Sequence, residues 1–139
     1  MNRQRLKERL ISDEGCELKP YPDKYNNWTV GVGRLMSRGI SQEEAFFLLA
    51  GDIELCEAQL RDNFVWFENL DDVRQEVLLN MCFQLGIGGL KKFRKFLKAL
   101  EERRFAVAKE EMLDSKWAKK DSPGRANELS DAMLVGRWL

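Results

Sequence analysis

Glu14, Asp23 and Thr29 place two carboxyl groups and a hydroxyl in one short stretch near the start of the chain. Glu14 follows an amphipathic run and directly precedes Gly15, so we expect it at the C-terminal end of a helix. That end carries partial negative charge and disfavours an ionised acid, whereas Asp23 lies in a turn-rich patch with backbone N–H groups nearby. Hydrolysis of a glycosidic bond needs one carboxyl group that stays protonated and one that stays ionised. On spacing alone, the simpler interpretation is favoured, in which both are solvated acids.

The sequence around these groups predicts a helix followed by a β-hairpin. The apolar side chains of residues 2–13 have helical spacing. Residues 18–21 are strand-like, residues 22–27 are rich in turn formers, and residues 28–33 alternate and contain β-branched side chains. Each of the two carboxylates would therefore lie at a junction between elements.

The rest of the chain predicts helices. Ser41 and Glu44 have the spacing of a capping box, which begins a long helix. Residues 69–72 would cap a second helix, which we expect the glycine-rich residues 86–89 to end. The basic side chains of residues 91–98 are interpreted as the solvated face of a helix that covers the core, with membrane or nucleic-acid contact as the alternative.

Several segments of the chain resemble the phage-type lysozymes, glycoside hydrolase family 24. The signature segment has Glu14, eight residues, Asp23, five residues and then Thr29, with Gly15 after the acid and Gly31-x-Gly33 after the threonine. Further similarity extends in the right order along the chain, in residues 80–86, 115–117, 122–126 and 136–138. Because the resemblance covers nearly the whole sequence, it outweighs the interpretation based on spacing alone.

The resemblance implies an α+β, mostly helical lysozyme-like fold in a single domain over residues 1–139. A small β-hairpin lobe would cover residues 15–41, and a connecting helix would cover residues 42–62. Residues 1–14 and 63–139 would form a larger helical lobe, with the active site in the cleft between the lobes. The loop before the long helix is much shorter than in the T-even phage enzymes, so we expect one wall of that cleft to be reduced.

The resemblance also implies a reaction, hydrolysis of the β-1,4 bond between N-acetylmuramic acid and N-acetylglucosamine in peptidoglycan. Glu14 would be the general acid on the glycosidic oxygen. Asp23 would activate or orient a water molecule on the opposite face of the sugar, and Thr29 would help to hold that water. Such a pair of carboxyl groups inverts the anomeric carbon when they stand far enough apart to admit water.

Further residues match supporting positions of the family. Arg125 would anchor Glu14 by a charge-assisted hydrogen bond, which opposes the effect of the helix end on that acid. The remaining assignments are sugar contacts by Leu35 and Phe83, a supporting role for Gln84, and an ion pair between Arg34 and Asp52. Phe83 could equally be a core residue.

Three departures from the family pattern concern substrate contacts. Arg34 stands where the best-known members have His, and Phe96 and Glu111 stand where they have Ser and Asn. These changes and the shortened loop allow one alternative, a peptidoglycan-binding protein with little or no turnover. A second alternative is a lytic transglycosylase, which needs only the acid. The complete set of Glu14, Asp23 and Thr29 favours the hydrolase over both.

The composition argues against several classes of site. The net charge of +0 gives no electrostatic footprint for nucleic acid. The absence of histidine excludes His-based triads and most zinc sites, and we expect no metal or cofactor. Cys16, Cys56 and Cys82 lack the spacing of metal ligands and are interpreted as buried free thiols.

The charged N-terminal segment, residues 1–10, predicts no signal peptide and no stable membrane insertion. We expect a monomer that is made in the host cytoplasm. It would reach the cell wall only after a separate membrane-permeabilising protein allows its release.

Overall fold

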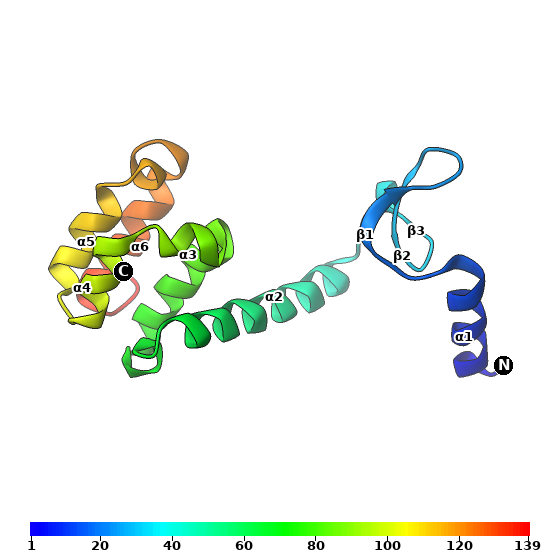
Figure 1. Ribbon diagram of the computed structural model, residues 1–139, viewed down its shortest axis with the longest axis horizontal. Coiled ribbons are helices and arrows are strands. Elements are labelled where there is room, and N and C mark those ends of the chain that lie inside the picture. The colour runs from blue at the N-terminus through cyan, green and yellow to red at the C-terminus, as the bar shows by residue number, and fades with distance from the viewer. The chain divides into compact units, whose positions relative to one another are not determined.

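The computed structural model describes residues 1–139, which divide into two compact units, residues 1–46 and residues 47–139. Helix α1 (Arg3–Glu14) opens the first unit (Figure 1). It begins at Asn2, whose side chain accepts a hydrogen bond from the N–H of Arg5, and it ends at Gly15, which has a φ of 76°. The predicted helix and its end at Glu14 are therefore confirmed. The units place α1 with the sheet, and its grouping with the helical lobe stays a prediction.

A three-stranded antiparallel sheet follows α1 in the order β1-β2-β3. Its strands are β1 (Glu17–Pro22), β2 (Trp28–Gly31) and β3 (Arg34–Leu35). The predicted hairpin is present as β1 and β2, and β3 adds a short third strand. The central strand places Thr29 opposite Tyr21 on one side and Leu35 on the other.

The long helix α2 (Gln42–Asn63) begins with the predicted capping box. The N–H of Glu44 donates to Ser41 Oγ at 3.1 Å, and the N–H of Ser41 donates to Glu44 Oε1 at 3.0 Å. This reciprocal pair satisfies two of the N–H groups that the start of a helix leaves without partners. A short 3₁₀ helix, η1 (Met36–Arg38), occupies the preceding loop.

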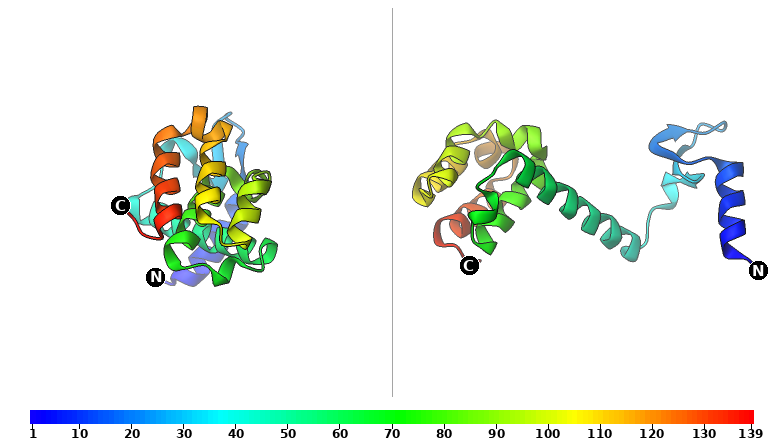
Figure 2. Two further views of the ribbon diagram at one scale, coloured as in Figure 1. Left: turned by 90° about the vertical axis from the view of Figure 1, so that its left-hand side faces the viewer. Right: turned by 60° about the horizontal axis from the view of Figure 1, so that its bottom comes forward.

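The second unit consists of helices around one apolar core (Figure 2). After η2 (Phe67–Asn69), they are α3 (Asp72–Lys91), α4 (Arg94–Glu101), α5 (Phe105–Leu113), a π-helical turn η3 (Trp117–Asp121) and α6 (Pro123–Val135). Helix α5 packs against both α4 and α6. No helix of the protein combines the length and apolar character that crossing a membrane requires.

Three predictions can be compared with this unit. Asp71 caps α3 through a bond from the N–H of Arg74, as residues 69–72 predicted. The predicted end in the glycine-rich residues 86–89 is confirmed at Gly86, whose non-helical φ of 74° and ψ of 161° end the first helix of α3 in a kink. A second helical segment, which the sequence did not predict, then runs to Lys91. The basic face of residues 91–98 is exposed while Phe96 and Leu97 are buried beneath it, so this segment covers the core as expected.

Candidate active site

Glu14 is the last residue of α1, and its side chain is exposed. Its carboxyl group lies against the backbone of Gly33, in the turn between β2 and β3. A Cβ atom placed on Gly33 would lie 2.5 Å from Glu14 Oε2 and 3.1 Å from Glu14 Cβ. The absence of a side chain at Gly33 therefore makes room for the carboxyl group of Glu14.

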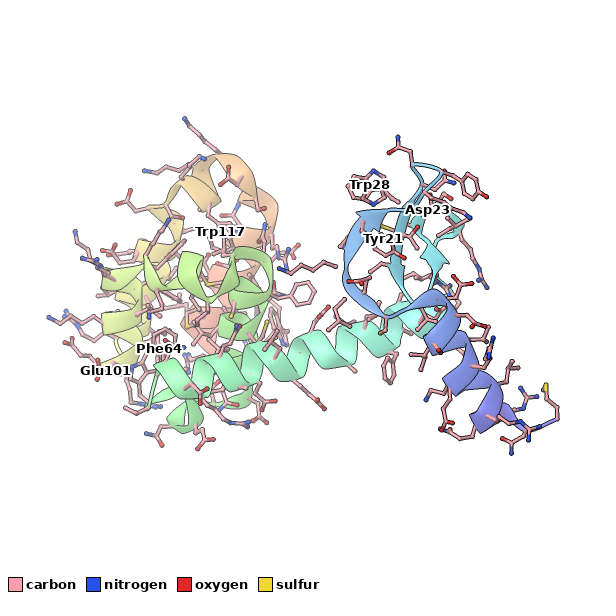
Figure 3. The ribbon with its side chains drawn as sticks, turned by 45° about the vertical axis from the view of Figure 1, so that its right-hand side comes forward. Tyr21, Asp23, Trp28, Phe64, Glu101 and Trp117 are labelled. Atoms are coloured by element: carbon pink, nitrogen blue, oxygen red, sulfur yellow. The ribbon has the colours of Figure 1, made fainter.

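Asp23 follows β1 directly, at the first position of the turn that leads to β2 (Figure 3). Its Oδ1 accepts hydrogen bonds from the N–H of Tyr25 at 2.9 Å and from the N–H of Asn27 at 2.8 Å. These are the backbone N–H groups that the turn-rich sequence predicted. They fix the orientation of the carboxylate and leave Oδ2 without a partner in the N-terminal unit.

Thr29 is buried in β2, with only 3% of its surface exposed. Its hydroxyl group donates to the carbonyl oxygen of Asn27 at 2.9 Å. Sequence reasoning did not identify Asn27, whose backbone contacts both Asp23 and Thr29. The only signal in the sequence was its place in the turn, because the bonds use backbone atoms that every residue possesses.

Arg34 has a different partner from the one predicted. Its Nη2 donates to Glu44 Oε1 at 3.1 Å and to the carbonyl of Gly39 at 3.2 Å. The pair with Glu44 was not predicted, and the Arg34–Asp52 pair stays a prediction. Glu44 belongs to the first turn of α2, beside the short loop that follows Arg34, whereas Asp52 lies eight residues, about 12 Å, further along the helix.

The same contacts affect the pKa of Glu44. Hydrogen bonds from the backbone and side chain of Ser41 lower this pKa from its ordinary value of 4.5, and the positive charges of Arg34 and Arg38 lower it further. The capping box and the ion pair thus act on one carboxylate, which connects β3 to the start of α2.

In the second unit, Gln84 joins two elements that follow it in the chain. Its Oε1 accepts from the indole Nε1 of Trp117 at 2.9 Å, and its Nε2 donates to Ser122 Oγ at 2.7 Å. Trp117 is buried, so Gln84 supplies the acceptor that its N–H needs. This contact explains a positioning role for Gln84 that the sequence did not specify.

Phe83 and Arg125 line a hollow of about 400 Å³ together with residues of α2 and α3. Phe83 is 46% exposed, which decides against the alternative that it is a core residue. The Nε of Arg125 donates to Asn80 Oδ1 at 2.8 Å. Asn80 is a second residue that sequence reasoning did not assign, although it lies in the segment that resembles the family.

Phe96 and Glu111, two of the departures from the family pattern, line another hollow of about 600 Å³. Phe96 is 1% exposed and packs edge-on against Phe93, with ring centroids 6.2 Å apart. It therefore contributes to the core and offers no polar group to a ligand. Glu111 is partly exposed and adds an acidic side chain to the wall of the hollow.

Comparison with known proteins shows similarity over nearly the whole chain. Residues 12–131 match the family described as "Phage lysozyme". Two proteins of Dictyostelium discoideum, "Probable T4-type lysozyme 2" and "Probable T4-type lysozyme 1", are 29% and 26% identical to this chain, and each alignment covers 94% of both proteins. The "Pre-baseplate central spike protein Gp5" of Enterobacteria phage T4 is 27% identical, over 94% of this chain and 28% of its own length.

Proposed function

The chain belongs to the phage lysozyme family and is a glycoside hydrolase, and from this premise we propose that it cleaves peptidoglycan at the β-1,4 bond between N-acetylmuramic acid and N-acetylglucosamine. One observation carries the proposal. Glu14, Asp23 and Thr29, which match the family signature, all belong to residues 1–46, where Asp23 and Thr29 are held by hydrogen bonds to the backbone and Glu14 lies beside Gly33.

Glu14 acts as the general acid in this proposal. Its side chain is exposed at the end of α1, so its carboxyl group is accessible to the oxygen of a bound glycosidic bond. Protonation of that oxygen lets the leaving sugar depart as an alcohol rather than as an alkoxide.

Asp23 and Thr29 together orient the attacking water. Tyr25 and Asn27 occupy Asp23 Oδ1, so Oδ2 is the oxygen that takes a proton from the water. The hydroxyl proton of Thr29 is directed to Asn27, so Thr29 Oγ1 faces the water as an acceptor. A water that donates one hydrogen to each oxygen keeps a lone pair for the anomeric carbon.

Residues outside this group contribute binding and support. Leu35, paired with Thr29 across β2 and β3, and Phe83, at the hollow in the second unit, contact the sugar rings. Arg125 uses its Nε for Asn80, which leaves its terminal nitrogens for charge-assisted hydrogen bonds.

The proposal is tested by the variant Glu14→Gln in a cell-wall turbidity assay. We expect turnover to fall by about 10²–10⁴-fold, the range of general acid catalysis, while circular dichroism shows an unchanged fold. The matched control is Asp13→Asn, which removes one negative charge from the neighbouring residue of α1 and retains activity. Clearance by Glu14→Gln at a third of the parent rate would mean that Glu14 is not the acid.

Product analysis tests the assignment of Asp23. Attack by water from the face opposite the leaving group gives the α anomer, which NMR of a short soluble substrate detects before mutarotation. A β product would make Asp23 a nucleophile. A product with an anhydro end, seen by its mass, would identify a transglycosylase instead of a hydrolase.

A further inference from the structure

We propose that Gly33 is a positioning residue for the carboxyl group of Glu14, and that the Arg34–Glu44 ion pair holds Gly33 in place. The inference rests on the proposed role of Glu14 as the general acid. It adds two positions, Gly33 and its support, to the residues on which catalysis depends.

The first step of the argument is steric. A Cβ atom on residue 33 would lie 2.5 Å from Glu14 Oε2, 3.0 Å from Cδ and 3.1 Å from Cβ. Rotation of the outer part of the side chain would relieve only the first two contacts, because helix α1 fixes the Cβ of Glu14. Any side chain at position 33 therefore displaces the carboxyl group.

The second step separates this contact from backbone strain. Gly33 has a φ of 59°, so any L-residue there would be strained even if space were available. Gly31 belongs to the same turn region and has a φ of 69°, yet a Cβ atom on Gly31 would meet nothing within 4 Å. The two glycines thus share the strain and differ in the contact with Glu14.

The third step concerns what holds Gly33. The next residue, Arg34, pairs with Val30 in the sheet, and its guanidinium group binds the Gly39 carbonyl and the Glu44 carboxylate. Glu44 is itself fixed by the N–H of Ser41 at the start of α2. The turn that supports the acid is therefore tied to the rigid first turn of a long helix.

The consequence for catalysis follows from geometry. A misplacement of about 1 Å in a catalytic group can cost about 10²-fold in rate. Gly33→Ala is therefore expected to lower kcat by about 10²-fold with little change in KM. Because the environment of the acid changes, the pH profile of kcat is also expected to shift.

The experiment compares Gly33→Ala with Gly31→Ala. We expect both to lower the melting temperature to a similar extent, because both place alanine at a positive φ, and only Gly33→Ala to lower kcat strongly and shift its pH profile. Equal losses of kcat in the two variants would overturn the proposal, as would parent kcat in Gly33→Ala.

Arg34→Met tests the support and remains informative if Gly33→Ala does not fold. It removes the guanidinium group from Gly39 and Glu44 without adding a side chain beside Glu14. We expect lower kcat at unchanged KM, partial recovery in Arg34→Lys, and an altered NMR titration of the Glu14 Cδ. Parent kcat together with a parent titration curve in Arg34→Met would overturn the role of the ion pair. Parent wall cleavage by Glu14→Gln would instead refute the assignment of Glu14 as the acid, on which this inference rests. Absence of wall cleavage by the parent protein would refute the proposed function itself.

Discussion

Asp23 and Thr29 are hydrogen-bonded to the same residue, Asn27. The N–H of Asn27 donates to Asp23 Oδ1 at 2.8 Å, and its carbonyl oxygen accepts from Thr29 Oγ1 at 2.9 Å and from the N–H of Asp23 at 2.9 Å. One residue of the turn therefore sets the carboxylate and the hydroxyl relative to each other. A change at either side chain is expected to affect the other through this shared contact.

Replacement of Thr29 tests this arrangement. Thr29→Val keeps the shape of the side chain but removes the bond to Asn27, so we expect a loss of about 1 kcal/mol in the free energy of unfolding. Because the water loses an acceptor, we also expect activity to fall by about 10²-fold. Thr29→Ser keeps the hydroxyl group and is the control that retains most activity. Urea denaturation and wall turbidity measure the two effects, and equal activity in the Val and Ser variants would contradict the assigned role.

Glu44 makes the stability of the protein depend on pH. The folded-state pKa of Glu44 is lowered from 4.5, chiefly by hydrogen bonds from Ser41 and also by Arg34. The folded state therefore favours the ionised form, and the stabilisation is complete above about pH 4.5 and is lost as the pH falls through the lower folded-state value.

The measurement is a urea denaturation series of Glu44→Gln and parent from pH 3 to pH 8. We expect a constant difference between pH 6 and pH 8 that shrinks below about pH 4.5. Glu43→Gln, one residue earlier in α2 and without the contacts to Ser41 and Arg34, is the control and should cost less stability. A difference that stays the same at pH 3 would rule out the ion pair as its source.

The three thiols are expected to differ in reactivity. All three cysteines are free, but Cys16 is exposed, which corrects the prediction that all are buried. Burial raises the pKa of the Cys82 thiol to about 11, and the neighbouring Cys56 adds to this effect. At pH 8 its thiolate fraction is therefore on the order of 10⁻³, and the thiolate is the reactive form.

We expect Ellman's reagent to modify one thiol rapidly in the native protein and three in denaturant. Cys16→Ser should abolish the rapid reaction and leave the two slow thiols unchanged. Rapid modification of a second thiol in the folded protein would show that the contact region of Cys56 and Cys82 opens readily.

The sequence by itself determined the local features of this protein. The end of α1 at Glu14, the backbone bonds to Asp23 and the capping box of Ser41 and Glu44 were predicted and are present. Each depends on atoms only a few residues apart, so residue type and spacing suffice to specify it. The same applies to Asp71, which caps α3 through Arg74, three residues later.

Only the tertiary structure decided which distant residues meet. It paired Arg34 with Glu44, buried Phe96 and left Phe83 exposed. It also placed Gly33 beside the carboxyl group of Glu14. These outcomes depend on how far a short loop can reach and on which face of a helix packs inward. An identical side chain is compatible with either result until its neighbours are in place, which is why residue type alone could not specify them.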